Sequence, residues 1–297
     1  MSADLSFVIV TWNARATIWR CINSIFNQAP DAEVIVVDNN SADETASYVE
    51  QRFPSVHVIR NPWNAGFGQA CNAGAALARG KYVCFLNPDA VLDANCITAI
   101  METFETSPDI AICGPALRSS SGAVTSAGER FLTIPRFILR RVFGIKRVRV
   151  PECPAKVDWV SGAALFVSRE WFEAAGGFDH RFWMYVEDMH LCWKANSDGL
   201  AVRIVPEASV THDHATSART AVERTLRSNA ASTFLWFRER GRPEFCPVVR
   251  ALLFCSLLTV GAKHCAEARS LRSARIYLSL SLAVIMRPST LMSVTNG

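Results

Sequence analysis

Short apolar runs alternate with amphipathic segments along the first hundred residues. The runs are rich in β-branched residues, have the length of buried strands, and are bounded by polar or turn residues. They lie at residues 5–10, 34–37, 56–59 and 82–86. This pattern predicts four buried strands.

The segments between these runs have helical periodicity. We predict helices at about 16–27, ended by Pro30, and at 67–79, ended by Gly80. Ser41, followed three residues later by Glu44, has the spacing of a capping box that starts another helix. Alternation of this kind predicts a parallel, right-handed α/β layer, which binds ligands at the carboxyl edge of its strands.

The remainder of the chain is less regular. A strand-like pattern resumes at 158–166, and residues 136–149 mix basic and apolar side chains. Such a mixed stretch is either a solvated helix face or a surface for an anionic membrane or acceptor. We predict a catalytic domain over 1–240, with a nucleotide-binding half at about 1–117 and an acceptor half at about 118–240.

The last segment, 241–297, is predicted to be a helical appendage. Its apolar runs at 251–262 and 276–286 are shorter than the ~20 residues that a membrane-spanning helix needs. Basic residues separate the two runs. Two interpretations stand equally: the helices lie in a membrane interface, or they pack on the domain or on a partner subunit, which leaves self-association open.

Composition narrows the class of protein. The chain has 297 residues, 50% of them hydrophobic, which is enough for a large core, and its net charge of +4 gives no indication of nucleic-acid binding. Ten cysteines are scattered without a C-x-x-C pair, and Cys84, Cys113 and Cys255 lie in apolar runs where burial is expected. With no signal peptide before the first strand, we expect a cytoplasmic protein without a disulfide framework.

Acidic residues follow two of the predicted strands. Asp38 ends the second strand, where its carboxylate can accept the ring N–H of a uracil or thymine or can cap a turn. Asn87-Pro88-Asp89 follows the fourth strand, and a carboxylate there can hold a metal ion against phosphate oxygens. Gly66-x-Gly68 lacks the third glycine of a dinucleotide fingerprint and follows the third strand, which argues against a nicotinamide enzyme.

Further along the chain, the two acidic residues Glu187-Asp188 precede a short helical segment. Neighbouring side chains point apart, so we expect one of them to face the site and act as a general base. The helix dipole should keep that carboxylate ionised at some cost in basicity. His212 and His214 follow the strand-like run at 202–205. They complete a metal site, touch a diphosphate or are structural.

Taken in order, these elements resemble the family 2 glycosyltransferases, and in particular bacterial rhamnosyltransferase-like members that build cell-surface polysaccharide. The likeness spans roughly Leu5 to Arg238. It is carried by Val10-Thr11-Trp12-Asn13, Val37-Asp38-Asn39-Asn40-Ser41, Asn64-Ala65-Gly66-Phe67-Gly68, Phe85-Leu86-Asn87-Pro88-Asp89-Ala90, Gly162-Ala163, Gly176-Gly177-Phe178-Asp179 and Tyr185-Val186-Glu187-Asp188-Met189-His190-Leu191.

The resemblance implies an A-type glycosyltransferase fold, with a Rossmann-like, mostly parallel central sheet flanked by helices. It also implies a nucleotide diphosphate sugar donor and a divalent metal, Mg or Mn. Asp188 would be the base, Asp89 and His212 metal ligands, and Glu187 and Trp183 acceptor-side residues. The implied donor-binding residues are Thr11, Asn13, Asp38, Asn40, Asn64, Gly68, Asn87 and Asp89.

The expected activity is inverting transfer of a sugar to a glycan or lipid-linked glycan at the inner face of the cell membrane. Rhamnose from dTDP-rhamnose is the leading donor, and a UDP-hexose is the alternative. Asn87, His190 and Lys194 depart from the family pattern, so a non-catalytic, membrane-associated homologue that binds nucleotide sugars remains a rival. A nucleotidyltransferase on a similar α/β layer is a further rival.

Overall fold

The computed structural model describes residues 4–142, 150–212, 222–240 and 247–255. They belong to two compact units, each built from separate stretches of the chain. The first unit comprises Met1–Phe131, Val148–His180 and Glu187–Arg219, and the second comprises Leu132–Arg147, Arg181–Val186 and Thr220–Gly297. The domain boundaries at 117 and 240 stay predictions.

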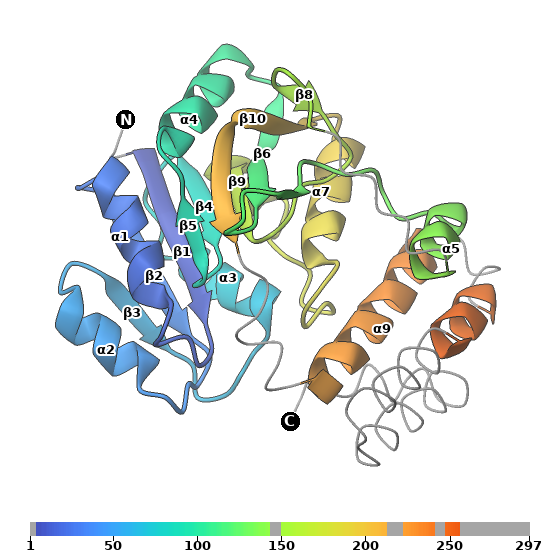
Figure 1. The fold of residues 1–297 in the computed structure, drawn as a ribbon, viewed down its shortest axis with the longest axis horizontal. Helices are drawn as coiled ribbons and strands as arrows, with labels where there is room; N and C mark the ends of the chain where they lie inside the picture. Colours follow the sequence, from blue (N-terminus) through green and yellow to red (C-terminus); the bar gives the residue numbers. More distant parts are fainter. Residues whose placement is uncertain (1–3, 143–149, 213–221, 241–246, 256–297) are drawn as a thin grey trace. The chain divides into compact units, whose positions relative to one another are not determined.

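The first unit is a central sheet with helices on both faces (Figure 1). Its strands are β1 (Leu5–Thr11), β2 (Glu33–Asp38), β3 (His57–Arg60), β4 (Tyr82–Leu86), β5 (Ala90–Leu92), β6 (Ile110–Arg118), β7 (Val124–Ser126), β8 (Ala155–Lys156), β9 (Ala164–Ser168) and β10 (Ala201–His212). Its helices are α1 (Ile18–Gln28), α2 (Thr45–Arg52), α3 (Phe67–Ala75), α4 (Cys96–Thr106), α6 (Arg169–Ala174) and α7 (Glu187–Ser197).

The sheet is mixed: its first four strands are parallel as the sequence predicts, but among the described strands four pairs are parallel and five are antiparallel. The main strand order is β3-β2-β1-β4-β9-β6-β10-β5, with β7 beside β6 and β8 beside β10. Strands β3, β2, β1 and β4 pair in parallel, and β10 pairs in parallel with β6. Strand β9 runs antiparallel to both of its neighbours, β4 and β6, an inversion that the sequence did not reveal.

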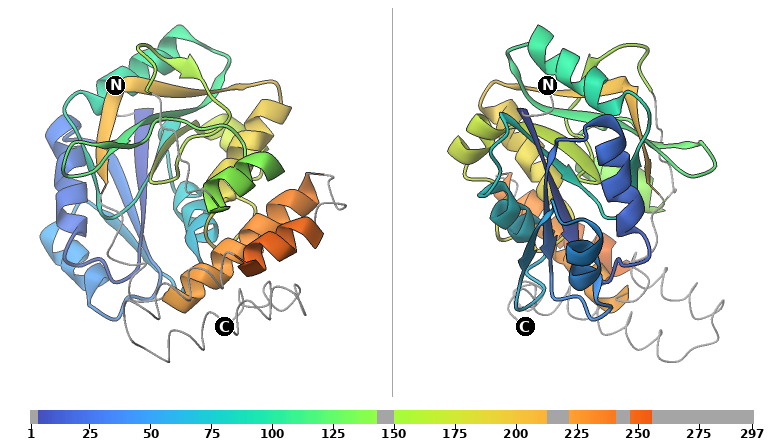
Figure 2. Two further views of the ribbon diagram at one scale, coloured as in Figure 1. Left: turned by 45° about the vertical axis from the view of Figure 1, so that its right-hand side comes forward. Right: turned by 90° about the vertical axis from the view of Figure 1, so that its left-hand side faces the viewer.

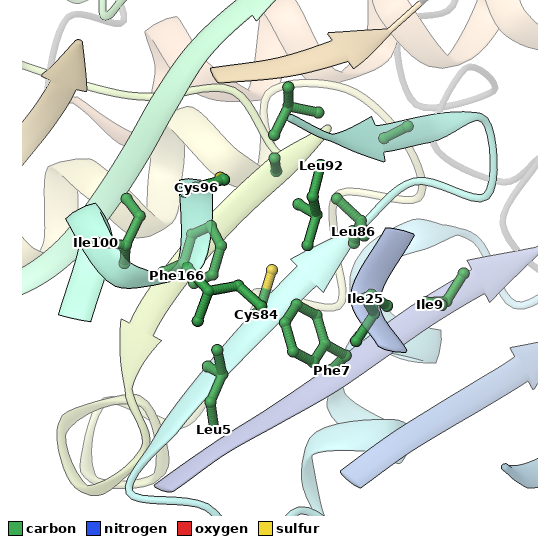
Figure 3. Packing of buried hydrophobic residues seen from close by; sticks show 14 of the residues in the cluster. Leu5, Phe7, Ile9, Ile25, Cys84, Leu86, Leu92, Cys96, Ile100 and Phe166 are labelled. Carbon is green, nitrogen blue, oxygen red and sulfur yellow. The ribbon is translucent and has the colours of Figure 1, made fainter. Parts of the chain in front are cut away.

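Alternation along the strands divides the core between the two faces of the sheet. On one face, Phe7 and Phe166 meet edge to face and pack with side chains of α1 and α4 (Figure 3). On the other face, Phe85 packs against Phe172 and Phe178, near α3, α6 and α7. Figure 2 shows helices on both sides of the sheet. Each large apolar side chain buried in this way contributes about 1.5–3 kcal/mol.

Three local predictions were wrong. Helix α3 ends at Ala75 and not at residue 79. Helix α2 begins at Thr45 and its N-cap, Glu44, has a left-handed backbone without a side-chain cap, so there is no capping box. The Ser41 hydroxyl is bonded to Asp38 instead, which removes it from the helix end. Cys84 and Cys113 are buried as expected, but Cys255 is exposed. No disulfide joins the cysteines that the structure describes.

The second unit contains α5 (Ile134–Val142), α9 (Val222–Glu239) and a helix over 247–255. The indole N–H of Trp236 donates to the Leu132 carbonyl at 3.0 Å, and Phe137 packs on Phe237. Within the described ranges, no helix is both long and apolar enough to cross a bilayer. Most of the predicted tail, including 256–297, lies outside the described residues.

Candidate functional site

Three neighbouring parallel strands end at the same edge of the sheet, and each is followed by predicted site residues. Thr11 ends β1 directly beside Asp38, which ends β2. Asn87 follows β4, which lies on the other side of β1. The structure therefore brings the predicted donor residues of these strands to the carboxyl edge, where open α/β sheets bind ligands.

Asp38 is almost completely buried and is held by a small polar network. It accepts hydrogen bonds from the Ser41 backbone N–H at 3.0 Å and from the Ser41 hydroxyl. The Ser41 hydroxyl accepts from the Asn13 N–H at 2.8 Å, and Asn13 Oδ1 accepts from the Ala42 N–H at 2.8 Å. Asn13 and Asn40 both have left-handed backbones, which asparagine tolerates better than most residues. These contacts fix the two loops that carry Asn13 and Asn40.

Thr11 is fully buried, and its hydroxyl has no hydrogen-bond partner among the described residues. Its carbonyl accepts from the Asn39 N–H at 2.8 Å, which joins the ends of β1 and β2. Thr11 therefore lies at the predicted edge, beneath the surface rather than on it.

The loop between β3 and α3 is fastened to Asn39. Asn39 Nδ2 donates to the Gly66 carbonyl at 3.0 Å, and Asn39 Oδ1 accepts from Asn61 Nδ2 at 2.8 Å. Asn64 Oδ1 accepts from the Gly66 N–H at 3.0 Å. Gly68 lies in the first turn of α3, at the helix end that favours an anion. Asn64 and Gly68 thus lie on the segment that joins the Asp38 region to α3.

A second group forms at the end of β4. His212 Nε2 lies 3.2 Å from Asp89 Oδ1 and 3.2 Å from Asn87 Nδ2. His212 is the last residue of β10, paired with Ala90 in the antiparallel β5 ladder, and it is 4% exposed. The predicted metal residues Asp89 and His212 are therefore neighbours. His214, the other histidine of the predicted motif, lies outside the described residues.

The donor set of Asp89 and His212 fits a divalent cation. A carboxylate oxygen and an imidazole nitrogen suit Mn²⁺, and one carboxylate suits Mg²⁺ when phosphates and water complete its shell. Among the described residues, no group of three or more His, Cys, Asp or Glu side chains could form an all-protein metal site.

Asp188 lies in the first turn of α7, as predicted. Its Oδ2 accepts a hydrogen bond from the Gly162 N–H at 2.8 Å, and its Oδ1 accepts from the Met189 N–H at 2.7 Å. The helix dipole was expected to keep this carboxylate ionised, but desolvation raises the pKa of Asp188. The backbone hydrogen bonds lower the pKa by less than desolvation raises it, and the nearby Glu129 carboxylate adds to the rise. A higher pKa makes the ionised form a stronger base.

Glu187 is also buried. Desolvation, followed by the charge of Asp188, raises its pKa well above the ordinary value. Its Oε2 is buried and has no hydrogen-bond partner among the described residues. The expectation that only one of the two carboxylates faces the site stays a prediction.

Two adjacent residues before Glu187 have unusual backbones. Tyr185 and Val186 have φ angles of 67° and 72°. Positive φ is costly for a β-branched residue, and such strain gathers at functional sites. Nothing in the residue types predicted it.

Trp183 belongs to the second unit. Its ring lies under the Arg224 guanidinium, 4.1 Å from the Arg224 Cζ to the ring centroid. Its predicted acceptor-side role stays a prediction, because Glu187 and Asp188 belong to the first unit.

The sequence reasoning gave no role to Asn72. Its amide donates to the Phe178 carbonyl at 2.8 Å and its Oδ1 accepts from the Phe178 N–H at 2.9 Å. Gly177 has a left-handed φ of 71°, and a Cβ there would lie 2.5 Å from Asn72 Oδ1. The pair Gly176-Gly177 in the sequence was the available signal for this tight contact.

Comparison with known proteins decides the family. Residues 6–173, more than half of the chain, match the family described as Glycosyl transferase family 2. The chain belongs to this family. It is a glycosyltransferase, and the resemblance in its ordered motifs is confirmed.

Curated relatives include rhamnosyltransferases. The N-acetylglucosaminyl-diphospho-decaprenol L-rhamnosyltransferase of Mycobacterium tuberculosis is 26% identical over 264 residues, covering 81% of this chain and 86% of the relative. The rhamnosyltransferase WbbL of Escherichia coli is 24% identical over 187 residues, covering 59% of this chain and 71% of the relative.

Among solved structures, the mannosyltransferase PcManGT from Pyrobaculum calidifontis, in complex with GDP-Man and Mn²⁺, aligns with a TM-score of 0.59. The identity is 19%, and the alignment covers 98% of this chain and 84% of that one. At this identity the likeness concerns the fold, and it confirms the predicted A-type glycosyltransferase architecture.

Proposed function

We propose that this glycosyltransferase moves rhamnose from dTDP-rhamnose to a glycan or lipid-linked glycan, with inversion at the anomeric carbon. The observation that carries the catalytic part is the Asp188 carboxylate, held by the Gly162 N–H at 2.8 Å with a raised pKa. A carboxylate with these properties suits a general base for a hydroxyl nucleophile.

In the proposed reaction, Asp188 takes the proton of an acceptor hydroxyl, and the oxygen of that hydroxyl attacks the anomeric carbon of the donor. The attack comes from the face opposite the diphosphate. The bond between the anomeric carbon and the diphosphate oxygen breaks, and the nucleoside diphosphate leaves with the electron pair. The Gly162 and Met189 amides hold the carboxylate for this transfer. Asp188 must be ionised first, so its raised pKa predicts that activity is lost on acidification at a higher pH than for an ordinary aspartate.

On the donor side, Asp38 would accept the ring N–H of the base, with Asn13 and Asn40 on the loops beside it. Asn64 and Gly68 would lie along the nucleotide. Asp89 and His212 would hold a divalent cation, Mg or Mn, with Asn87 beside them. When bound, the cation would neutralise charge on the leaving diphosphate.

The rhamnose assignment is supported by two relatives, which are both named as rhamnosyltransferases. Asp38 itself suits uracil as well as thymine, because both bases carry the same ring N–H. A UDP-hexose donor is therefore the alternative.

The acceptor assignment is supported by the lipid-linked substrate in the name of the Mycobacterium tuberculosis relative. Helix α5 exposes both basic and apolar side chains, which a lipid-facing surface would need. Its exposed residues include Arg136, Arg140 and the apolar Leu139, which is 43% exposed. Basic and apolar side chains together favour an anionic membrane surface, so we propose action at the inner face of the cell membrane.

A transfer assay tests the proposal. The full-length enzyme is incubated with radiolabelled dTDP-rhamnose or UDP-hexoses, Mg²⁺ or Mn²⁺, and a polyprenyl-diphosphate-linked N-acetylglucosamine. We expect rhamnose transfer by the wild type and a loss of about 10²–10⁴-fold in Asp188→Asn, with donor affinity retained. Transfer that is unchanged in Asp188→Asn would contradict the proposed base.

The non-catalytic alternative rests on the departures at Asn87, His190 and Lys194. His190 Nε2 lies 3.9 Å from Asp179 Oδ2, so it has a structural neighbour within the first unit. Donor binding by wild type and Asp188→Asn alike, with no transfer to any acceptor in the panel, would favour this alternative.

A further inference from the structure

Trp63 is the most exposed of the large apolar side chains that the structure describes, with 64% of its surface open to solvent. It lies in the loop between β3 and α3, at the carboxyl edge of the sheet. An indole left in water does not contribute the favourable free energy that its burial would give. Exposed aromatic side chains are common platforms on which planar ligands stack.

The loop that carries Trp63 is fastened at both ends to one residue, Asn39. Asn61, two residues before Trp63, donates its side-chain amide to Asn39 Oδ1 at 2.8 Å. Gly66, three residues after it, accepts from Asn39 Nδ2 at 3.0 Å. Asn39 follows Asp38 directly, so Trp63 stands on a short loop anchored beside that carboxylate.

One further contact and the length of the chain limit how far Trp63 can be from Asp38. The Asn61 backbone N–H donates to the Asp38 carbonyl at 2.9 Å. Two residues of chain span at most about 7 Å, so the Trp63 Cα lies within that distance of the Asn61 Cα. Pro62 has a fixed φ, which reduces the backbone freedom of the loop just before Trp63.

We propose that the Trp63 indole stacks on the base of the nucleoside diphosphate and forms one wall of the base pocket. Asp38 reads the edge of the base by accepting its ring N–H, and Trp63 covers its face. The proposal rests on the proposed function, because it takes the Asp38 region as the nucleoside end of the donor site. Stacking does not depend on which base is bound, so Trp63 supplies affinity and Asp38 supplies selectivity.

Calorimetric titration tests the role of Trp63. Full-length wild type, Trp63→Ala and Trp63→Phe are titrated with TDP, UDP and inorganic pyrophosphate in Mg²⁺. Leu77→Ala serves as the control, because Leu77 is also exposed (53%) but lies beyond the carboxyl-terminal end of α3. Thermal unfolding of each variant verifies that the fold is retained.

We expect Trp63→Ala to weaken TDP and UDP binding by about 5- to 150-fold, with most of the affinity restored in Trp63→Phe. Pyrophosphate has no base, so its affinity should not change, and Leu77→Ala should bind like the wild type. Wild-type affinity for TDP and UDP in Trp63→Ala would overturn the stacking role and leave the proposed function standing. Failure of the folded wild type to bind either nucleotide would overturn both.

Discussion

The backbone N–H of Gly162 donates to Oδ2 of Asp188 at 2.8 Å, although the two residues are 26 positions apart in the sequence. Gly162 lies just before β9, the strand that runs antiparallel between β4 and β6. The turn that leads into β9 therefore holds the carboxylate that we propose as the base.

Gly162→Ala is expected to lower kcat without weakening donor binding. An added Cβ would lie 3.2 Å from the Asp188 Cβ and 3.3 Å from the Phe67 ring, so the carboxylate or the ring must shift. The shift needed is a few tenths of an ångström, and because a displacement of ~1 Å can cost about 10²-fold in rate, we expect the loss in kcat to stay below about 10²-fold. Steady-state kinetics and TDP titration measure the two quantities, and an unchanged kcat would show that this contact does not position Asp188.

Glu187→Gln is expected to change how stability depends on pH. In the native state, desolvation and the neighbouring Asp188 raise the Glu187 pKa well above its ordinary value, which is about 4.3. Between the two values the native state holds a proton that the unfolded chain has lost, so stability falls as pH rises. Glutamine has no proton to lose, so the variant should gain stability relative to wild type over this pH range.

Urea unfolding at several pH values from 4 to 8 measures this slope. Asp188 also has a raised pKa, so part of the slope should remain in the variant. Glu102→Gln, at an exposed position on α4, is the control and should keep the wild-type slope. Identical slopes in wild type and Glu187→Gln would contradict the buried, protonated state of Glu187.

Asn72→Ala is expected to destabilise the fold by about 1–3 kcal/mol. The substitution leaves the Phe178 N–H and carbonyl without the two hydrogen bonds that Asn72 makes. Asn27→Ala, at an exposed position of α1, is the matched control and should change stability by less than about 0.5 kcal/mol. Equal unfolding midpoints for the two variants would exclude a structural role for the Asn72 contact.

Reversing the charge of α5 is expected to weaken membrane binding. Each basic residue near an anionic bilayer contributes about 1 kcal/mol, so the double variant Arg136→Glu/Arg140→Glu should bind anionic vesicles at least about tenfold less tightly. Arg20→Glu/Arg52→Glu reverses two exposed charges on α1 and α2 and should bind like the wild type. Equal loss in both double variants would indicate an effect of net charge rather than of α5.

Much of the parallel half of the sheet could be predicted from sequence. Strand β4 (Tyr82–Leu86) has the predicted bounds, because a strand buried on both faces leaves a continuous apolar run. Asp38 lies at the carboxyl edge as predicted, since it follows such a run directly. The direction of β9 could not be predicted, because residue types do not say which strands pair or in which sense.

The internal contacts of the site were less accessible from sequence. Ser41 was expected to cap a helix, but Asp38 and Asn13 bind its hydroxyl, and several polar partners compete for a serine in a loop. Val186 has a left-handed backbone that its branched side chain disfavours. Such a conformation is set by the surrounding structure, and local propensity argues against it.

Thermal unfolding with a panel of nucleotide diphosphate sugars tests the central claim, a metal-dependent donor site at the carboxyl edge of the sheet. The panel includes dTDP-rhamnose, UDP-glucose and UDP-galactose, each with and without Mn²⁺ or Mg²⁺, on wild type and Asp89→Ala. A ligand that binds only the native state adds about 2.7 kcal/mol at 100 times its Kd, so the Tm must rise. We predict a rise with dTDP-rhamnose that requires the metal and is lost in Asp89→Ala. A folded wild type whose Tm responds to no donor, or an equal rise in Asp89→Ala, would contradict the account.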